Sequence, residues 1–178
     1  MMKTYTLIAV VGTLMMAPAG AQASGTASAV IGDGAKNGAT WEASVRAAAK
    51  AKSSNSACLD VFVQVKEAGG QATECGAVRL VLPVYERLAE GRGRQMLTVF
   101  SALMPPAIQS VGLSLGSRGF QRMRVEQLGP ASAKRAGVER FSYLARAFRG
   151  PVCIKRLRGF GESGEVLTDI SFPRCHES

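Results

Sequence analysis

Arginine is the residue whose number and spacing give this sequence its clearest potential chemistry. Residues 24–91 carry seven basic and seven acidic side chains, whereas residues 92–178 carry 14 basic and six acidic ones. Twelve of those 14 basic residues are arginine. A guanidinium is a planar fork that pairs with a carboxylate or phosphate through two parallel hydrogen bonds. The second half of the chain therefore has the composition of an anion-binding surface.

Strand alternation predicts that many of these arginines share one exposed face, because successive side chains of a strand point to opposite sides. If Phe141 and Tyr143 face the core, Arg140 and Arg146 face outward. The residues predicted to bind an anionic partner are Arg118, Arg122, Arg124, Arg140, Arg146, Arg156 and Arg158. The alternative is a solvated basic face, whose arginines form cross-strand ion pairs. The acidic residues available for such pairs are Glu126, Glu139 and Asp169.

The sequence lacks the motifs required for other kinds of catalytic, metal-binding or phosphate-binding site. The only histidine, His176, is the third residue from the C-terminal end, where a catalytic triad would be poorly positioned. The cysteines form no CxxC pair, so no metal site is predicted. The glycine-rich run 159–164 lacks the lysine of a phosphate-binding loop and indicates a hairpin turn. We therefore predict no catalytic residue and no cofactor.

The N-terminus has the pattern of a cleavable signal peptide over residues 1–23. Lys3 precedes an apolar run over residues 7–16, and Ala21 and Ala23 form a small-x-small cleavage site. This run is half the length needed to span a bilayer. We therefore expect a periplasmic or secreted protein without a transmembrane span, and its composition is typical of a Gram-negative bacterium. Residues 24–38, rich in glycine, serine and alanine, predict a flexible leader, and residues 39–178 a single globular domain.

An even number of cysteines in an exported protein predicts disulfides. The four cysteines allow three pairings. We favour Cys58–Cys75 and Cys153–Cys175, because each pair closes a short segment between neighbouring elements.

The first half of the domain favours helices. Residues 40–52 have a threonine that can cap a helix, an alanine-rich centre and a basic end. Trp41 and Val45 lie four residues apart, as on one helix face. A strand is predicted over 59–66, a second helix over 83–90, and a buried segment, helix or strand, over 95–104.

The second half of the domain favours strands over 120–128, 138–148, 151–160 and 165–172, separated by glycine-containing turns. Short connections join antiparallel neighbours. The predicted fold class is therefore α+β, with helices mainly in the N-terminal half and one four-stranded antiparallel sheet in the C-terminal half. This order of elements resembles the arrangement of NTF2-like domains, or a cystatin-like one, by analogy of fold alone.

Three functions are compatible with these patterns. The first is a non-enzymatic binding or accessory protein whose arginine face meets an acidic protein or an anionic envelope component. Nucleic acid is not the expected partner, because exported proteins meet little of it. The second is a small-ligand-binding domain with an apolar pocket, lined by Met96, Phe100, Met104, Phe141 and Tyr143. The third is a hydrolase that relies on Asp, Glu, Arg and Tyr.

Overall fold

The described part of the chain is almost entirely β-structure. A computed structural model describes residues 27–36, 38–49, 56–65, 68–78, 81–88 and 97–172. Within these residues lie three four-stranded antiparallel sheets, which we call sheets A, B and C, and one short α-helix. The signal peptide predicted over residues 1–23 lies outside the described residues. No helix in the described ranges is long and apolar enough to cross a membrane.

Sheet A is formed by the first four strands in chain order, each paired with the next. Its strands are β1 (Ser28–Lys36), β2 (Ala39–Ala47), β3 (Ser56–Val65) and β4 (Ala68–Ala77). Apolar side chains of β2 and β3 alternate with polar ones, so that Val45, Leu59 and Val61 are fully buried on one face. Sheet A therefore presents one face to the core and one to solvent.

Sheets B and C are assembled from segments that alternate along the chain. Sheet B has the order β5-β6-β10-β9, with β5 (Leu82–Leu88), β6 (Leu97–Met104), β10 (Ser142–Arg149) and β9 (Glu126–Gln127). Sheet C has the order β12-β11-β7-β8, with β12 (Val166–Ser171), β11 (Arg156–Phe160), β7 (Ser110–Ser114) and β8 (Phe120–Arg124). A 3-10 turn, η1 (Gly116–Arg118), precedes β8, and the helix α1 (Pro130–Ala136) follows β9.

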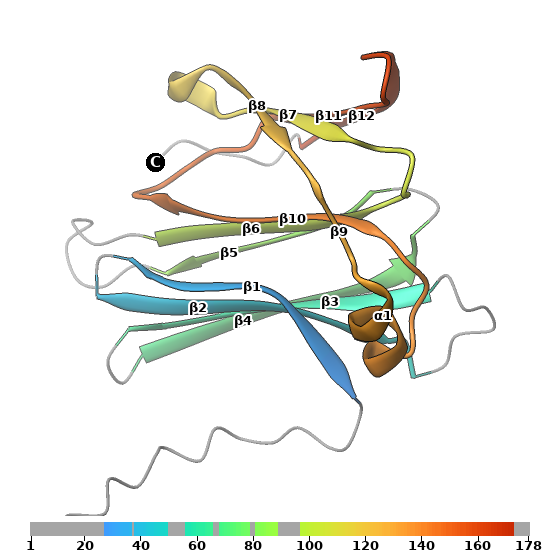
Figure 1. Cartoon of the computed structure of the whole chain (residues 1–178). Coiled ribbons are helices and arrows are strands. Elements are labelled where there is room, and N and C mark those ends of the chain that lie inside the picture. Colours follow the sequence, from blue (N-terminus) through green and yellow to red (C-terminus); the bar gives the residue numbers. More distant parts are fainter. Residues whose placement is uncertain are drawn as a thin grey trace, which may run out of the picture.

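The three sheets are stacked, with sheet B in the middle (Figure 1). Every residue of β6 is buried. Leu97, Val99 and Leu103 belong to the hydrophobic cluster shared with sheet A, whereas Phe100 and Met104 belong to the cluster shared with sheet C. The segment predicted to be buried over 95–104 is thus a central strand, covered on both faces.

Two buried hydroxyl groups of β6 form hydrogen bonds to the backbone of the neighbouring chain segment. Ser101 Oγ donates to the carbonyl of Leu144 at 3.1 Å. Thr98 Oγ1 donates to the carbonyl of Gly150 at 3.0 Å and accepts the backbone N–H of Val152 at 3.2 Å. Because an unpaired hydroxyl is costly to bury, these bonds make polar residues compatible with a fully buried strand.

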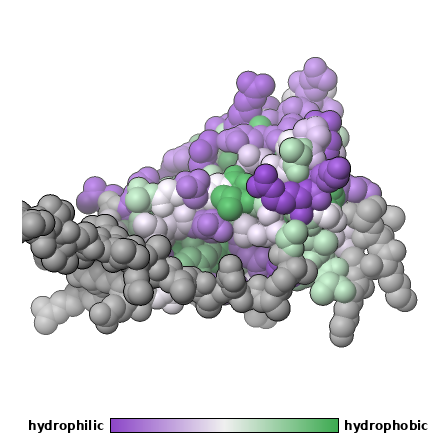
Figure 2. Space-filling model, turned by 60° about the horizontal axis from the view of Figure 1, so that its bottom comes forward, coloured by the Kyte–Doolittle hydropathy of each residue, from purple (hydrophilic) through white to green (hydrophobic). Residues whose placement is uncertain are grey.

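In the view of Figure 2, the coloured surface combines hydrophilic and near-neutral residues with hydrophobic residues in small separate patches. The large hydrophobic residues that the described chain exposes include Val30 and Phe62 of this sheet. Exposed hydrophobic residues scattered in this way are ordinary in folded proteins.

The α+β prediction is wrong in its N-terminal half. Of the residues predicted as a helix over 40–52, residues 40–47 belong to strand β2, and of those predicted as a helix over 83–90, residues 83–88 belong to β5; residues 50–52 and 89–90 lie outside the described ranges. The strand predicted over 59–66 is confirmed as β3. A spacing of four residues, as between Trp41 and Val45, is a multiple of two and therefore also fits one face of a strand. Packing between sheets A and B then outweighs the helix propensity of alanine.

The prediction of one four-stranded sheet in the C-terminal half is also wrong. β10 joins the central sheet B, whereas β8, β11 and β12 join sheet C with β7 as a further strand. The NTF2-like or cystatin-like arrangement fails with it, since the described residues form three antiparallel sheets and one short α-helix. Residues 28–36, within the segment predicted as a flexible leader, form the edge strand β1, held by its backbone pairing with β2.

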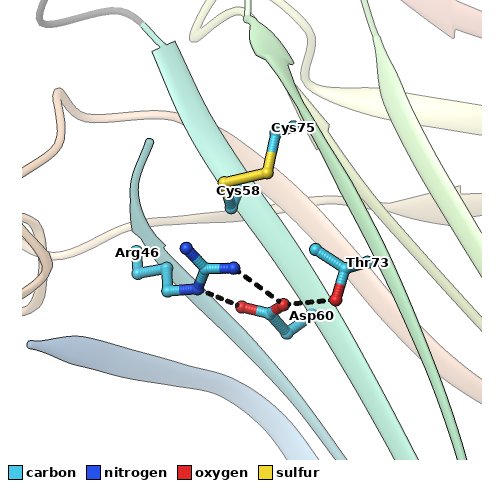
Figure 3. Close-up of polar contacts among 5 residues, drawn as sticks. All are labelled: Arg46, Cys58, Asp60, Thr73 and Cys75. Carbon is cyan, nitrogen blue, oxygen red and sulfur yellow. Dashed lines mark hydrogen bonds and ion pairs between the residues drawn. A yellow bond between two sulfur atoms is a disulfide. The ribbon is translucent and has the colours of Figure 1, made fainter. Parts of the chain in front are cut away.

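The disulfide Cys58–Cys75 is confirmed and joins β3 to β4 at directly opposite positions (Figure 3). Beside it, Asp60 lies between two partners on the outer face of sheet A. Arg46 Nε is 2.8 Å from Asp60 Oδ2, and Thr73 Oγ1 donates to Asp60 Oδ1 at 2.6 Å. The second predicted disulfide, Cys153–Cys175, includes a residue outside the described ranges and stays a prediction.

We expect the variant Cys58→Ala/Cys75→Ala to lose about 3 kcal/mol of unfolding free energy. The cross-link closes a loop of 17 residues and restricts the unfolded chain. Denaturant unfolding monitored by circular dichroism measures this loss. As a control, Thr73→Ala removes one exposed hydrogen bond beside the disulfide and should cost no more than about 1 kcal/mol. Equal losses in the two variants would contradict the prediction.

Candidate functional site

The outer face of sheet C carries four of the seven predicted arginines. The register places Arg156 of β11 opposite Ser114, which lies opposite Phe120 of β8. In the next row, Arg158 lies opposite Gly112, and Gly112 opposite Arg122. Inner residues of the same strands, including Val111, Leu113 and Leu157, are fully buried. The alternation therefore turns the arginines to solvent, and we call Arg122, Arg124, Arg156 and Arg158 the arginine face.

Asp169 of β12 is the acidic residue within this face. Its carboxylate accepts two hydrogen bonds from Arg156, one from Nε to Oδ1 at 2.6 Å and one from Nη2 to Oδ2. Arg158 Nε donates to Asp169 Oδ2 at 3.2 Å. The hydrogen bond from Arg156 lowers the pKa of the Asp169 carboxyl, and the same bond raises the pKa of Arg156. The predicted cross-strand pairing is thus confirmed for Asp169, which holds two of the four guanidinium groups.

Within the described residues, the other two arginines of the face are not paired with a carboxylate. The guanidinium of Arg122 lies 4.4 Å from the centroid of the Phe160 ring, and its Nε donates to Ser110 Oγ at 3.1 Å. Arg124 has no ion-pair or hydrogen-bond partner within the part of the chain that the structure describes. These two side chains keep their charge available to an incoming anion.

A shallow depression of about 140 Å³ opens in the arginine face, and it is lined by Gly112, Ser114, Phe120, Arg156 and Arg158. Phe120 is 55% exposed and lies directly over Gly112. A Cβ atom at position 112 would be 2.1 Å from Cζ of that ring, so glycine is required for the aromatic ring to lie flat on the strand. The depression therefore joins an aromatic surface to two guanidinium groups, in a space the size of one small side chain.

The remaining predicted arginines lie elsewhere. Arg118, in η1, donates from Nη2 to the backbone carbonyl of Arg149. Arg140 is exposed just before β10, and Arg146 is exposed on β10 of sheet B. Alternation along each strand correctly indicated exposure, but it could not show that β10 belongs to another sheet. The aromatic residues of the face, Phe120 and Phe160, were missed, although each lies two residues from an arginine and therefore shares its strand face.

A second concave site lies between the edges of sheets A and B. This cleft has a volume of about 740 Å³, and it is lined by residues 30–36 of β1 together with Trp41, Glu126, Tyr143, Ala145, Arg146 and Ala147. Tyr143 Oη donates to Glu126 Oε2 at 2.9 Å, and Lys36 Nζ donates to the carbonyl of Ala147 at 3.3 Å. Arg146 thus belongs to this cleft and not to the arginine face.

The predicted apolar pocket is not formed by the residues proposed to line it. Phe100 and Met104 are fully buried and Phe141 is 2% exposed, so all three are core residues. Met96 lies outside the described residues, and Tyr143 reaches the cleft. Among the residues that the structure describes, no group of His, Cys, Asp and Glu could hold a metal ion.

Comparison of the chain with protein-family models, with curated proteins and with solved structures gives no match.

The environment of Tyr143 predicts a pH dependence. Burial and then the hydrogen bond to Glu126 raise the pKa of Tyr143 from 10.0 to about 12. Because the folded pKa lies above the unfolded one, this contribution to stability is complete below pH 10 and is lost as the pH rises towards 12. An alkaline titration of tyrosinate absorbance should show a step near pH 12 that Tyr143→Phe removes. If Tyr143→Phe instead removed an absorbance step near pH 10, the raised pKa of Tyr143 would be contradicted.

Proposed function

We propose that this chain is an exported, non-enzymatic binding protein whose arginine face takes up an acidic segment of a partner protein. The observation that carries the proposal is the alignment of four arginines on the outer face of sheet C around a single carboxylate, Asp169. Export is inferred from the N-terminal sequence and places the partner in the periplasm or outside the cell.

The chemistry of the face favours a protein partner over a lipid surface. Arginine and aromatic residues are enriched at protein interfaces, where they contribute most of the binding energy. Phe120 and Phe160 lie among the arginines and can pack against apolar parts of a peptide. The guanidinium fork matches a carboxylate in two hydrogen bonds, as Arg156 already shows with Asp169.

The dimensions of the face favour a short segment. Neighbouring strands lie about 4.8 Å apart and residues about 3.4 Å apart along a strand, so four strands of about five residues span about 15 Å in each direction. A stable interface between two folded proteins covers about 800 Å² on each partner, several times this area. An extended segment with a few acidic residues fits the available surface.

We expect Arg122→Gln/Arg124→Gln to weaken binding of a synthetic glutamate-rich peptide about tenfold or more. These side chains hold the two charges that Asp169 does not engage, and each charge-assisted hydrogen bond to a carboxylate contributes about 1.5–3 kcal/mol. Fluorescence anisotropy of the labelled peptide measures the affinity. Binding should also weaken as salt rises from about 0.05 to 0.5 M.

The matched control is Arg140→Gln/Arg146→Gln, which removes the same charge from exposed positions outside sheet C. The control should change the affinity by less than about twofold, because at 0.15 M salt charges are screened over about 8 Å. An equal loss in both double variants would mean that net charge, and not the arginine face, attracts the peptide. No binding by the native protein would refute the proposed function.

Asp169 is expected to compete with the partner's carboxylates, since it occupies donors of Arg156 and Arg158. Asp169→Asn should therefore bind the same peptide at least about threefold more tightly. The control is Glu162→Gln, an exposed residue of the β11–β12 connection that removes the same charge without contacting either arginine. If both variants gain equally, the gain comes from net charge and the competition is disproved.

A further inference from the structure

The cleft between β1 and β10 is the larger of the two concave sites described above, and it is separate from the arginine face. Its volume of about 740 Å³ lies within the range of about 300–1,000 Å³ typical of small-molecule sites. One wall is the glycine-containing edge strand β1 of sheet A, and the other is β10 of sheet B with Glu126 of β9 at one end. The cleft is open to solvent.

The charged residues of the cleft balance one another. Asp33 and Glu126 supply hydrogen-bond acceptors, whereas Lys36 and Arg146 supply donors. An anionic ligand would be repelled by the two carboxylates, and a cationic ligand would be repelled by the two basic groups. A hydroxyl group is donor and acceptor at once, so one hydroxyl can satisfy a carboxylate and a basic side chain together. The lining therefore favours a neutral ligand with many hydroxyl groups.

Between the charged residues the cleft has small and aromatic groups. A Cβ atom on Gly32 would lie 2.6 Å from Cβ of Ala145 on β10 and 3.2 Å from Cη2 of Trp41, so glycine at this position lets β1 approach β10 and the indole closely. Trp41 lines the same region: a Cβ atom on Gly34 would lie 3.0 Å from its Nε1. Trp41 is partly exposed, and its indole offers apolar area with one polar hydrogen. A sugar ring has this combination of apolar faces and hydroxyl edges.

We propose that this cleft binds a neutral saccharide, with the ring against Trp41 and the hydroxyl groups between Asp33 and Arg146. The two binding sites then have different chemistry. Binding at the arginine face depends on salt and on Arg122 and Arg124, whereas binding in the cleft depends on neither.

The experiment uses the single tryptophan of the chain, Trp41, as its reporter. The folded, disulfide-intact protein is titrated with three neutral tetrasaccharides: β-1,4-linked glucose, α-1,4-linked glucose and β-1,4-linked N-acetylglucosamine. At least one should produce a saturable change in tryptophan emission. Raising the salt from about 0.05 to 0.5 M should leave its affinity within about twofold, since the ligand carries no charge.

Variants of the lining test the position of the ligand. Asp33→Ala/Arg146→Ala should weaken binding about tenfold or more, because it removes one acceptor and one donor. Both side chains are exposed and have no hydrogen-bond or ion-pair partner within the described residues, so the variant is expected to fold. Circular dichroism checks this. The control, Arg122→Gln/Arg124→Gln, should bind the saccharide as the native protein does.

The inference is overturned if none of the three saccharides produces a saturable change, or if the change survives Asp33→Ala/Arg146→Ala. Equal weakening by the cleft variant and the arginine-face variant would overturn it as well, because it would place the ligand at neither site. The outcome is independent of peptide binding at the arginine face, so each site can fail alone.

Discussion

Sheet B must bury both of its faces, and this requirement organises the other two sheets. β6 exposes no side chain, so sheet A has to cover one side of it and sheet C the other. Burying a strand on two sides removes the usual alternation of polar and apolar residues. The few polar groups that remain, such as Ser101 and Thr98, form hydrogen bonds within the layer. Sheets A and C are left with one free face each.

The free face of sheet C is suited to binding because its inner residues are apolar and its outer ones are not. Leu157 is buried between two arginines of β11, and Val111 and Leu113 flank Gly112 on β7. These buried apolar side chains therefore fix the backbone of the strands that carry the arginines. The exposed aromatic ring of Phe120 lies flat over Gly112. A rigid sheet that carries long charged side chains limits the conformational entropy lost on binding to those side chains.

Part of this arrangement could be predicted from the sequence. Alternation and turn residues identified β8, β10, β11 and β12, and cysteine number and spacing identified Cys58–Cys75. Exposure of Arg122, Arg124, Arg156 and Arg158 also followed from alternation. Which strands share a sheet could not be predicted. β10 pairs with β6, which lies about forty residues earlier, and local sequence patterns do not indicate which distant strands pair. The β1–β10 cleft depends on the same long-range packing.

The hydrogen bonds at the rim of β10 have a consequence for how the protein behaves at high concentration. Within the described residues, β10 pairs with β9 only at Ser142 and Tyr143, so its later residues form an open sheet edge. Lys36 and Arg118 donate to the carbonyls of Ala147 and Arg149 on that stretch. A strand from another molecule would have to displace two cations to pair there. Basic side chains over an unpaired edge are a known protection against edge-to-edge aggregation, and Lys36 and Arg118 are placed to act in this way.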